Sequence, residues 1–159
     1  MESMSGESKY PAPSSPVEVA AQPIRITGLN HLTLICSDLE QTTAFYRDVL
    51  GLALVDESVN ADDPATRHFW FSTDPDGVAG TALRLSFLEY PLLAPAVQGV
   101  GGTHHLALSV GSPNEVTAWR DYLQSRSVPT TESFNRDQLC SIYLRDPDGQ
   151  IIEIAAASA

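Results

Sequence analysis

The chain has 159 residues, of which 43% are hydrophobic, and its 20 acidic and 9 basic residues give a net charge of −11. This length accommodates one domain, or two small modules that share a core. The excess of acidic residues leaves no basic surface for nucleic-acid phosphates and disfavours binding to anionic membranes. In addition, no apolar run approaches the roughly 20 residues of a membrane span. We therefore expect neither a nucleic-acid partner nor a membrane partner.

Residues 1–23 are rich in Ser, Pro, Ala and Glu and show no apolar periodicity. This composition predicts a flexible N-terminal arm outside the folded domain. The arm lacks the basic region and apolar core of a secretory signal. Cys36 and Cys140 are too few for a disulfide framework, and reduced thiols are typical of the cytosol. We therefore expect a cytoplasmic protein.

The first half of the folded part begins with residues 29–36, in which apolar and polar residues alternate as in a strand. Ser37-Asp38-Leu39-Glu40 has the pattern of a capping box and predicts a helix, which Gly51 is well placed to end. Three further strands are expected, at residues 52–57, 68–72 and 81–89.

The second half repeats this order. Residues 103–110 predict a strand, and Ser112-Pro113-Asn114-Glu115 predicts a second capped helix with proline at its first position. Strands are expected at 140–144 and 150–155, separated by the turn Asp146-Pro147-Asp148-Gly149, in which glycine accommodates a positive φ.

The repeat is the main guide to the architecture. Each half opens with His-Leu-x-Leu (from His31 and from His105), continues with a Ser-x-x-Glu helix start and later contains Asp-Pro-Asp-Gly. The sequence thus predicts an α+β fold of two tandem βαβββ modules that form a curved, cup-like mixed sheet. We expect a single domain over 24–159, with module 1 at about 26–90, a linker at 91–102 and module 2 at about 103–156.

Glu153 is the lone carboxylate in the apolar run Ile151-Ile152-Glu153-Ile154-Ala155-Ala156. An unpaired buried carboxylate is costly, so Glu153 is expected to face water, pair with a cation or bind a metal. With His31 and His105 it makes a set of two histidines and one carboxylate. Such a set suits Fe(II), Mn(II), Zn(II) or a similar divalent ion and leaves coordination positions open.

Several segments resemble the vicinal oxygen chelate superfamily, which includes glyoxalase I, extradiol dioxygenases and fosfomycin thiol transferases. They are residues 28–34 (GLNHLTL), residues 44–52 (AFYRDVLGL) and the Asp-Pro-Asp-Gly turn that precedes Glu153. The resemblance covers about residues 26–156 and implies His31, His105 and Glu153 as metal ligands. The strand where glyoxalases carry a fourth ligand has Arg84 and Ser86 instead, which favours a three-ligand site.

Residues 102–108 (GTHHLAL), Trp119-Arg120 and residues 141–149 (SIYLRDPDG) resemble the ring-cleaving dioxygenase branch that acts on hydroquinones. This resemblance implies Fe(II) as the metal, with Mn(II), Zn(II) or Ni(II) as alternatives. It also implies that Tyr143 hydrogen-bonds a substrate phenolate and that Arg136 balances anionic charge.

The enzymes of that branch carry about two such domains in one chain, whereas this chain has one. We therefore expect a homodimer in which His31 of one subunit completes a site formed by His105 and Glu153 of the other.

The leading prediction is an Fe(II) dioxygenase that cleaves a dihydroxylated aromatic ring. One alternative is a glyoxalase-like lyase or isomerase, or a thiol transferase, that uses the same ligands for Lewis-acid chemistry. A second is a non-enzymatic drug- or antibiotic-binding protein like those of bleomycin resistance. The fold is common to all three, so only the site distinguishes them.

Overall fold

The computed structural model describes residues 26–76, 82–136 and 138–158. The arm expected at residues 1–23 lies outside the described residues. Within the described part, no helix combines the length and the apolar character needed to span a membrane.

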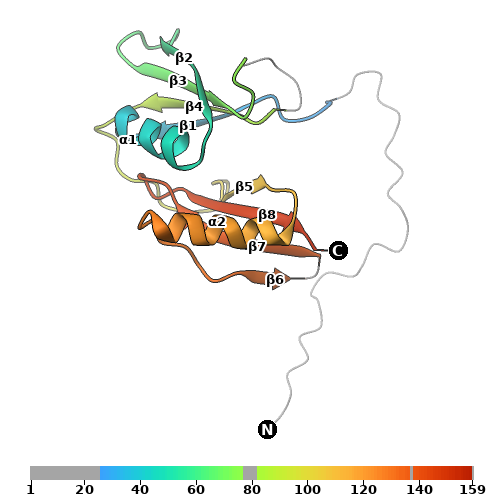
Figure 1. The fold of residues 1–159 in the computed structure, drawn as a ribbon. Coiled ribbons are helices and arrows are strands. Elements are labelled where there is room, and N and C mark those ends of the chain that lie inside the picture. Colours follow the sequence, from blue (N-terminus) through green and yellow to red (C-terminus); the bar gives the residue numbers. More distant parts are fainter. Residues whose placement is uncertain (1–25, 77–81, 137, 159) are drawn as a thin grey trace, which may run out of the picture.

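Module 1 contains the elements from β1 to β4 (Figure 1). Its sheet has four strands in the order β1-β4-β3-β2, with β1 parallel to β4 and the other pairs antiparallel. The bounds are β1 (Leu32–Cys36), α1 (Leu39–Thr43), the π-helical η1 (Ala44–Val49), β2 (Ala53–Val59), β3 (Arg67–Ser72) and β4 (Arg84–Glu89).

Module 2 repeats this topology with the order β5-β8-β7-β6, in which β5 is parallel to β8. Its elements are β5 (Leu106–Ser109), α2 (Pro113–Ser125), β6 (Phe134–Arg136), β7 (Leu139–Arg145) and β8 (Ile151–Ala157). The prediction of an α+β fold built from two tandem βαβββ modules is confirmed.

The first helix begins one residue later than the sequence indicated. Asp38, rather than Ser37, is the N-cap, and its side chain accepts from the backbone N–H of Gln41. Ser37 has a different partner, because its hydroxyl donates to Asp148 of module 2 at 2.5 Å. At the other end the prediction is correct: Gly51 has a φ of +77°, a conformation that favours glycine, directly after the last helical turn.

Helix α2 begins as its sequence predicts. Ser112 is the N-cap, its side chain accepts from the backbone N–H of Glu115, and Pro113 occupies the first turn. Val116 and Leu123 are fully buried, whereas Trp119 and Tyr122 are half-buried. The helix packs on β7 and β8.

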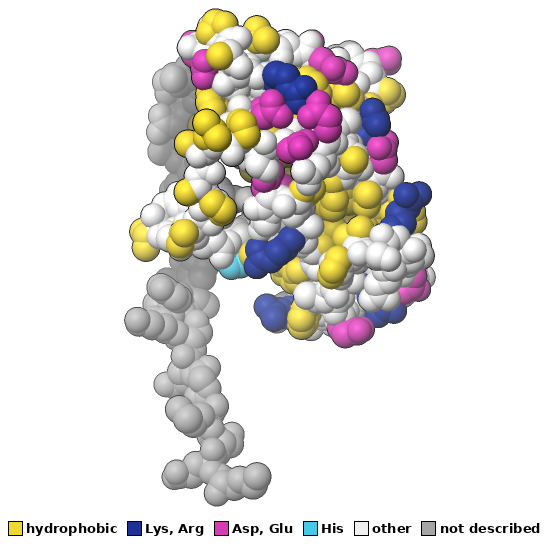
Figure 2. Space-filling view, turned by 90° about the vertical axis from the view of Figure 1, so that its left-hand side faces the viewer, with side chains coloured by type: hydrophobic (Ala, Val, Ile, Leu, Met, Phe, Trp, Pro, Cys, Tyr) yellow, Lys and Arg dark blue, Asp and Glu magenta, His cyan; other side chains and the backbone are white. Residues whose placement is uncertain are grey.

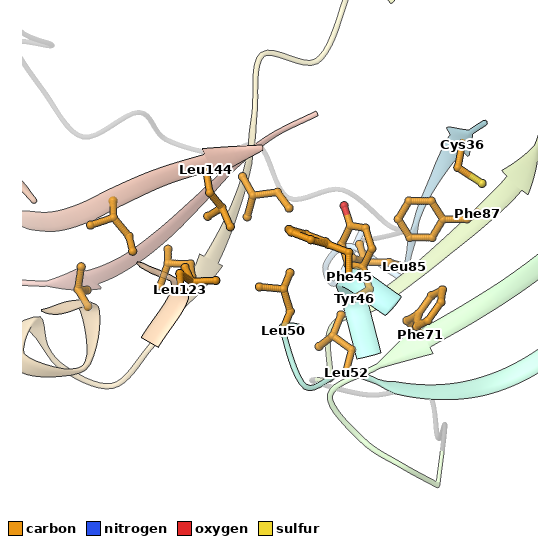
Figure 3. Packing of buried hydrophobic residues seen from close by; sticks show 14 of the residues in the cluster. Cys36, Phe45, Tyr46, Leu50, Leu52, Phe71, Leu85, Phe87, Leu123 and Leu144 are labelled. Atoms are coloured by element: carbon orange, nitrogen blue, oxygen red, sulfur yellow. The ribbon is translucent and has the colours of Figure 1, made fainter. Parts of the chain in front are cut away.

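The two modules share one hydrophobic core, which lies on the helix side of both sheets. Figure 3 shows Phe45 and Leu50 of module 1 facing Leu123 and Leu144 of module 2. Further buried members come from every layer: Leu39, Tyr46, Phe71, Leu85, Phe87, Val116, Ile142, Ile152 and Ile154. On the face shown in Figure 2, apolar side chains gather at the level where the two modules meet.

Polar contacts fix the modules to one another beside this core. The buried Tyr46 hydroxyl donates to Asp146 at 3.0 Å, and the Tyr122 hydroxyl donates to the backbone carbonyl of Val49 at 3.1 Å. Each contact joins a helix of one module to the other module. The modules therefore dock through their helix sides.

The opposite side of each sheet is here called the histidine face. In module 1 the register brings Thr33, Ser86 and Trp70 together on this face. In module 2 it brings Ala107, Glu153 and Tyr143 together. Because side chains alternate along a strand, these residues point away from the core that their neighbours build.

Candidate metal centre

The structure brings three of the predicted site residues together in module 2. Glu153 lies in the central strand β8, Tyr143 lies opposite it on β7, and His105 directly precedes β5 on the other side. The sequence had placed His105 within the strand, whereas β5 begins at Leu106.

Glu153 is buried, with 3% of its surface exposed, and both of its carboxylate oxygens have partners. His105 Nε2 lies 3.0 Å from Oε2, and the Tyr143 hydroxyl donates to Oε1 at 2.8 Å. The rings of His105 and Tyr143 meet edge to face, with centroids 5.9 Å apart. Glu153 therefore faces an imidazole and a phenol on the histidine face rather than solvent.

The geometry of this pair fits a divalent ion. Two donors that bind one ion at about 2.1 Å each and at right angles lie about 3.0 Å apart. The separation of His105 Nε2 and Glu153 Oε2 is 3.0 Å. A protonated histidine paired with a carboxylate gives the same distance. The separation alone is therefore compatible with a shared metal ion and does not require one.

His31 does not join this pair. It is exposed, directly precedes β1 and packs its ring against Trp70 of β3, with centroids 5.0 Å apart. Among the described residues, no group of three His, Cys, Asp or Glu side chains is arranged to hold a metal ion. One chain thus assembles two of the three predicted ligands, and the ligand set stays a prediction.

Each of the two histidines is contacted through Nδ1 by the residue before it. His31 Nδ1 lies 2.8 Å from Asn30 Oδ1, and His105 Nδ1 lies 2.8 Å from His104 Nδ1. Because the Asn30 oxygen can only accept, His31 donates through Nδ1, which leaves its Nε2 free as a lone-pair donor, as metal-binding histidines usually require.

The pKa of Tyr143 is raised, first by its hydrogen bond to Glu153 and then by burial. Both effects favour the neutral phenol. Tyr143 is therefore a hydrogen-bond donor at neutral pH in this arrangement.

Arg136 lies farther from Glu153. It is exposed on β6, and its guanidinium carbon lies 5.2 Å from the centroid of the Phe134 ring. Phe134 in turn contacts Tyr143, with centroids 6.0 Å apart. Arg136 is thus separated from Tyr143 by one aromatic ring, and its role stays a prediction.

The histidine face of module 1 holds a group that sequence reasoning missed. His68 and His31 both contact Trp70, and the Arg84 guanidinium carbon lies 4.8 Å from the centroid of the Trp70 ring. Burial lowers the pKa of His68, which favours its neutral form. The signal that could have revealed this group is the alternation of His68 and Trp70 with Phe69 and Phe71 along β3.

The two histidine faces are equivalent in register. Thr33 pairs with Ser86 as Ala107 pairs with Glu153, and Trp70 pairs with Ser86 as Tyr143 pairs with Glu153. Ser86 therefore occupies the position in module 1 that Glu153 occupies in module 2. Its hydroxyl donates to Thr33 at 2.8 Å.

A cleft of about 480 Å³ lies between the modules. Module 1 contributes His31 and Arg84 to its wall, and module 2 contributes Ser109 and Trp119. This volume is within the range of small-molecule sites, roughly 300–1,000 Å³.

Comparison with known proteins gives the wider context of this fold. The model of the Glyoxalase/Bleomycin resistance protein/Dioxygenase superfamily matches residues 28–154. The candidate ring-cleaving dioxygenases MhqA and MhqO of Bacillus subtilis are 27% and 34% identical over 84% and 80% of this chain. The chain spans only 41% and 39% of the length of these two relatives.

The metallothiol transferase FosB of Staphylococcus haemolyticus is 25% identical over 84% of this chain and 86% of its own length. Among solved structures, a glyoxylase/bleomycin resistance protein/dioxygenase domain from Frankia sp. aligns over 84% of this chain and 93% of its own, with a TM-score of 0.68 and 17% identity. The fosfomycin resistance protein FosX of Listeria monocytogenes, solved with Mn(II), aligns over 82% and 92%, with a TM-score of 0.60 and 24% identity.

Proposed function

Because the chain belongs to the Glyoxalase/Bleomycin resistance protein/Dioxygenase superfamily, we propose that it is a divalent-metal-dependent enzyme and, more specifically, an Fe(II) dioxygenase that opens a dihydroxylated aromatic ring. The observation that carries the proposal is the buried Glu153 held between His105 and Tyr143. The similarity to MhqA and MhqO supports the choice of a ring-cleaving reaction.

In this proposal His31, His105 and Glu153 hold the metal. A bound ferrous ion supplies Lewis acidity and redox chemistry. Mn(II), Zn(II) and Ni(II) are the alternative ions for the same donor set. Tyr143 Oη lies beside the carboxylate, where its neutral hydroxyl can hydrogen-bond a phenolate oxygen of the substrate. Arg136 contributes positive charge at the outer side of the Phe134 ring.

The separation of His31 from the other two ligands supports a homodimer. The modules dock through their helix sides, which leaves His31 and the His105–Glu153 pair on different sheets. Each site would then combine His105 and Glu153 of one subunit with His31 of the partner subunit. Covering the histidine face would also exclude water from the reacting groups.

A metallothiol transferase is the second candidate, favoured by size. The chain covers 86% of FosB but about two fifths of MhqA. In that case the same three side chains would hold a metal that polarises substrate oxygens, and no oxygen would be consumed.

The first experiment is elemental analysis of protein purified without a metal-affinity tag, followed by anaerobic Fe(II) reconstitution and oxygen-uptake assays with catechols and hydroquinones. The dioxygenase proposal predicts about one iron per subunit and substrate-dependent oxygen uptake. Bound manganese, nickel or zinc without oxygen uptake would favour the transferase. Protein that takes up no metal would overturn both.

Glu153→Gln tests the site directly. We expect a loss of metal affinity of about tenfold or more, because the amide removes the only negative charge of the donor set. The matched control is Glu57→Gln, an exposed glutamate of β2. Equal metal affinity of the two variants would contradict the ligand assignment.

A further inference from the structure

Among the arginines that the structure describes, Arg84 is the one whose aromatic partner is a tryptophan. Its guanidinium lies against the Trp70 ring, and the His31 and His68 rings contact the same tryptophan. Cation–π contact with the indole fixes the plane of the guanidinium. The histidine face of module 1 thus holds a preoriented cation next to a predicted metal ligand.

This cation lacks polar partners within the described residues. Arg84 Nε is buried and makes no hydrogen bond there, and the side chain forms no ion pair with any described carboxylate. By contrast, Arg67 pairs with both Glu40 and Glu89. In a chain with 20 acidic residues, the missing partner is not explained by a shortage of carboxylates.

A buried donor without a partner costs roughly 1–3 kcal/mol, and more when it is charged. A folded protein can retain such an unsatisfied donor where a ligand from outside the chain accepts its hydrogen bond in the functional state. His68 Nε2 on the same face is also buried and unpartnered among the described residues. Two buried, unsatisfied nitrogens thus lie beside one tryptophan on this face.

The position of Arg84 relates it to the proposed site. Arg84 and His31 line the same cleft of about 480 Å³. Arg84 also lies on β4 two residues before Ser86, the register counterpart of Glu153. Any subunit that supplies His31 to a shared site would therefore supply Arg84 with it.

We propose that Arg84, oriented by Trp70, binds a carboxylate group of the substrate, so that the substrate is a dihydroxylated aromatic acid rather than a neutral hydroquinone. The planar fork of arginine matches the two oxygens of a carboxylate. Trp70 and the two histidines provide aromatic surface for the substrate ring. The dihydroxylated ring rests on the proposed function, whereas the carboxylate rests on Arg84 alone.

Tryptophan fluorescence tests this binding without metal or turnover. The chain has two tryptophans, so Trp119→Phe leaves Trp70 as the single reporter and keeps an aromatic ring at the Trp119 position of the cleft wall. The full-length, metal-free variant is titrated with 2,5-dihydroxybenzoate, hydroquinone and phenylphosphonate. We expect 2,5-dihydroxybenzoate to quench Trp70 with a Kd about tenfold or more below that of hydroquinone, as for a hydrogen-bonded charged group.

Arg84→Gln in the same background should raise the Kd of the acid to that of hydroquinone and leave hydroquinone binding unchanged. Arg126→Gln is the matched control, because Arg126 is likewise stacked on an aromatic ring, that of Tyr122 at 4.9 Å, but lies on α2's C-cap. Arg84→Lys should restore part of the preference, since lysine keeps the charge and loses the fork.

Equal affinities for the acid and for hydroquinone in the Trp119→Phe protein would overturn the proposal even if Arg84→Gln fails to fold. Tighter binding of phenylphosphonate would overturn the carboxylate assignment. The fluorescence titration is done without metal, so a negative binding result leaves the metal-affinity result for Glu153→Gln unaffected. Likewise, an absence of oxygen uptake leaves the binding result unaffected.

Discussion

The hydrogen bond from Tyr143 to Glu153 orients a carboxylate that also faces His105. With Oε1 taken by the phenol and Oε2 facing the imidazole, the carboxylate plane has little freedom to rotate. Groups that orient a metal ligand in this way affect metal affinity and activity by about 10–100-fold. Tyr143 can therefore affect metal binding by orienting Glu153, independently of any contact with a substrate.

Tyr143→Phe should preserve the fold and lower kcat or metal affinity by about 10–100-fold, because Glu153 Oε1 loses its donor. Steady-state kinetics and anaerobic iron titration measure the two effects separately. Tyr90→Phe is the control. It also removes a hydrogen bond from a tyrosine to a carboxylate, because Tyr90 donates to Asp63 at 3.2 Å, but this pair lies away from the site. A variant of Tyr143 that behaves like the Tyr90 variant would contradict this role.

For individual residues, the sequence predicted that Glu153 needs a partner, but it did not predict the contacts of Arg84. A single carboxylate in an apolar strand requires a partner, and His105 and Tyr143 are partners within module 2. The stacking of Arg84 on Trp70 depends on which residues of β3 and β4 lie side by side. Such pairing follows from strand register, which a single sequence does not specify.

Among the elements, the turn Asp146-Pro147-Asp148-Gly149 is the most informative. As predicted, glycine takes a positive φ there, with a value of +89° at Gly149. The structure adds that Asp146 Oδ1 accepts from the backbone N–H groups of Asp148 and Gln150, while Oδ2 accepts from Tyr46. The turn therefore also docks module 2 onto a helix of module 1.

Asp146→Asn should reduce the dependence of stability on pH. Burial raises the pKa of Asp146, so its carboxyl group stabilises the folded state below the ordinary pKa of about 3.9, and this contribution is lost as the pH rises through the folded pKa. The difference in unfolding free energy, wild type minus variant, should therefore grow as the pH falls from 7 toward 4. Urea unfolding at several pH values measures it. The exposed Asp62→Asn variant is the control for the substitution itself.

The elements that the sequence missed are those governed by long-range contacts. The three-residue β6 has no buried residue, so it carries no apolar alternation and exists through pairing with β7. The choice of Asp38 over Ser37 as the cap follows from the hydrogen bond between Ser37 and Asp148, 111 residues away. Local patterns correctly predicted the helices and the longer strands.

For the whole molecule, the way the modules dock determines what one chain can assemble. The shared core and the Tyr46–Asp146 contact occupy the helix sides, and the described residues of one chain bring together only His105 and Glu153 of the three predicted ligands. The repeat predicted two modules, but their relative orientation depends on packing between residues far apart in sequence. This is why the sequence could predict three ligands without showing which of them lie close together.

Mixing two inactive variants tests whether sites are shared. In the proposed homodimer with shared sites, His31→Ala and Glu153→Ala would each damage every site. After the two are unfolded and refolded together, about half of the dimers are mixed, and each mixed dimer holds one intact site, which restores about a quarter of the wild-type sites. Oxygen uptake and bound iron measure the recovery. No recovery would mean that His31 and Glu153 serve the same site within one chain.

The equivalence of Ser86 and Glu153 in register also describes how a duplicated unit can specialise. The two halves of the chain retain the same strand order and a histidine at the same place, but they no longer carry the same chemistry. One copy has a carboxylate beside a phenol, and the other has a serine beside an indole that supports a guanidinium. The two modules therefore cannot replace one another, and the loss of a functional side chain in one module is not compensated by the equivalent position in the other.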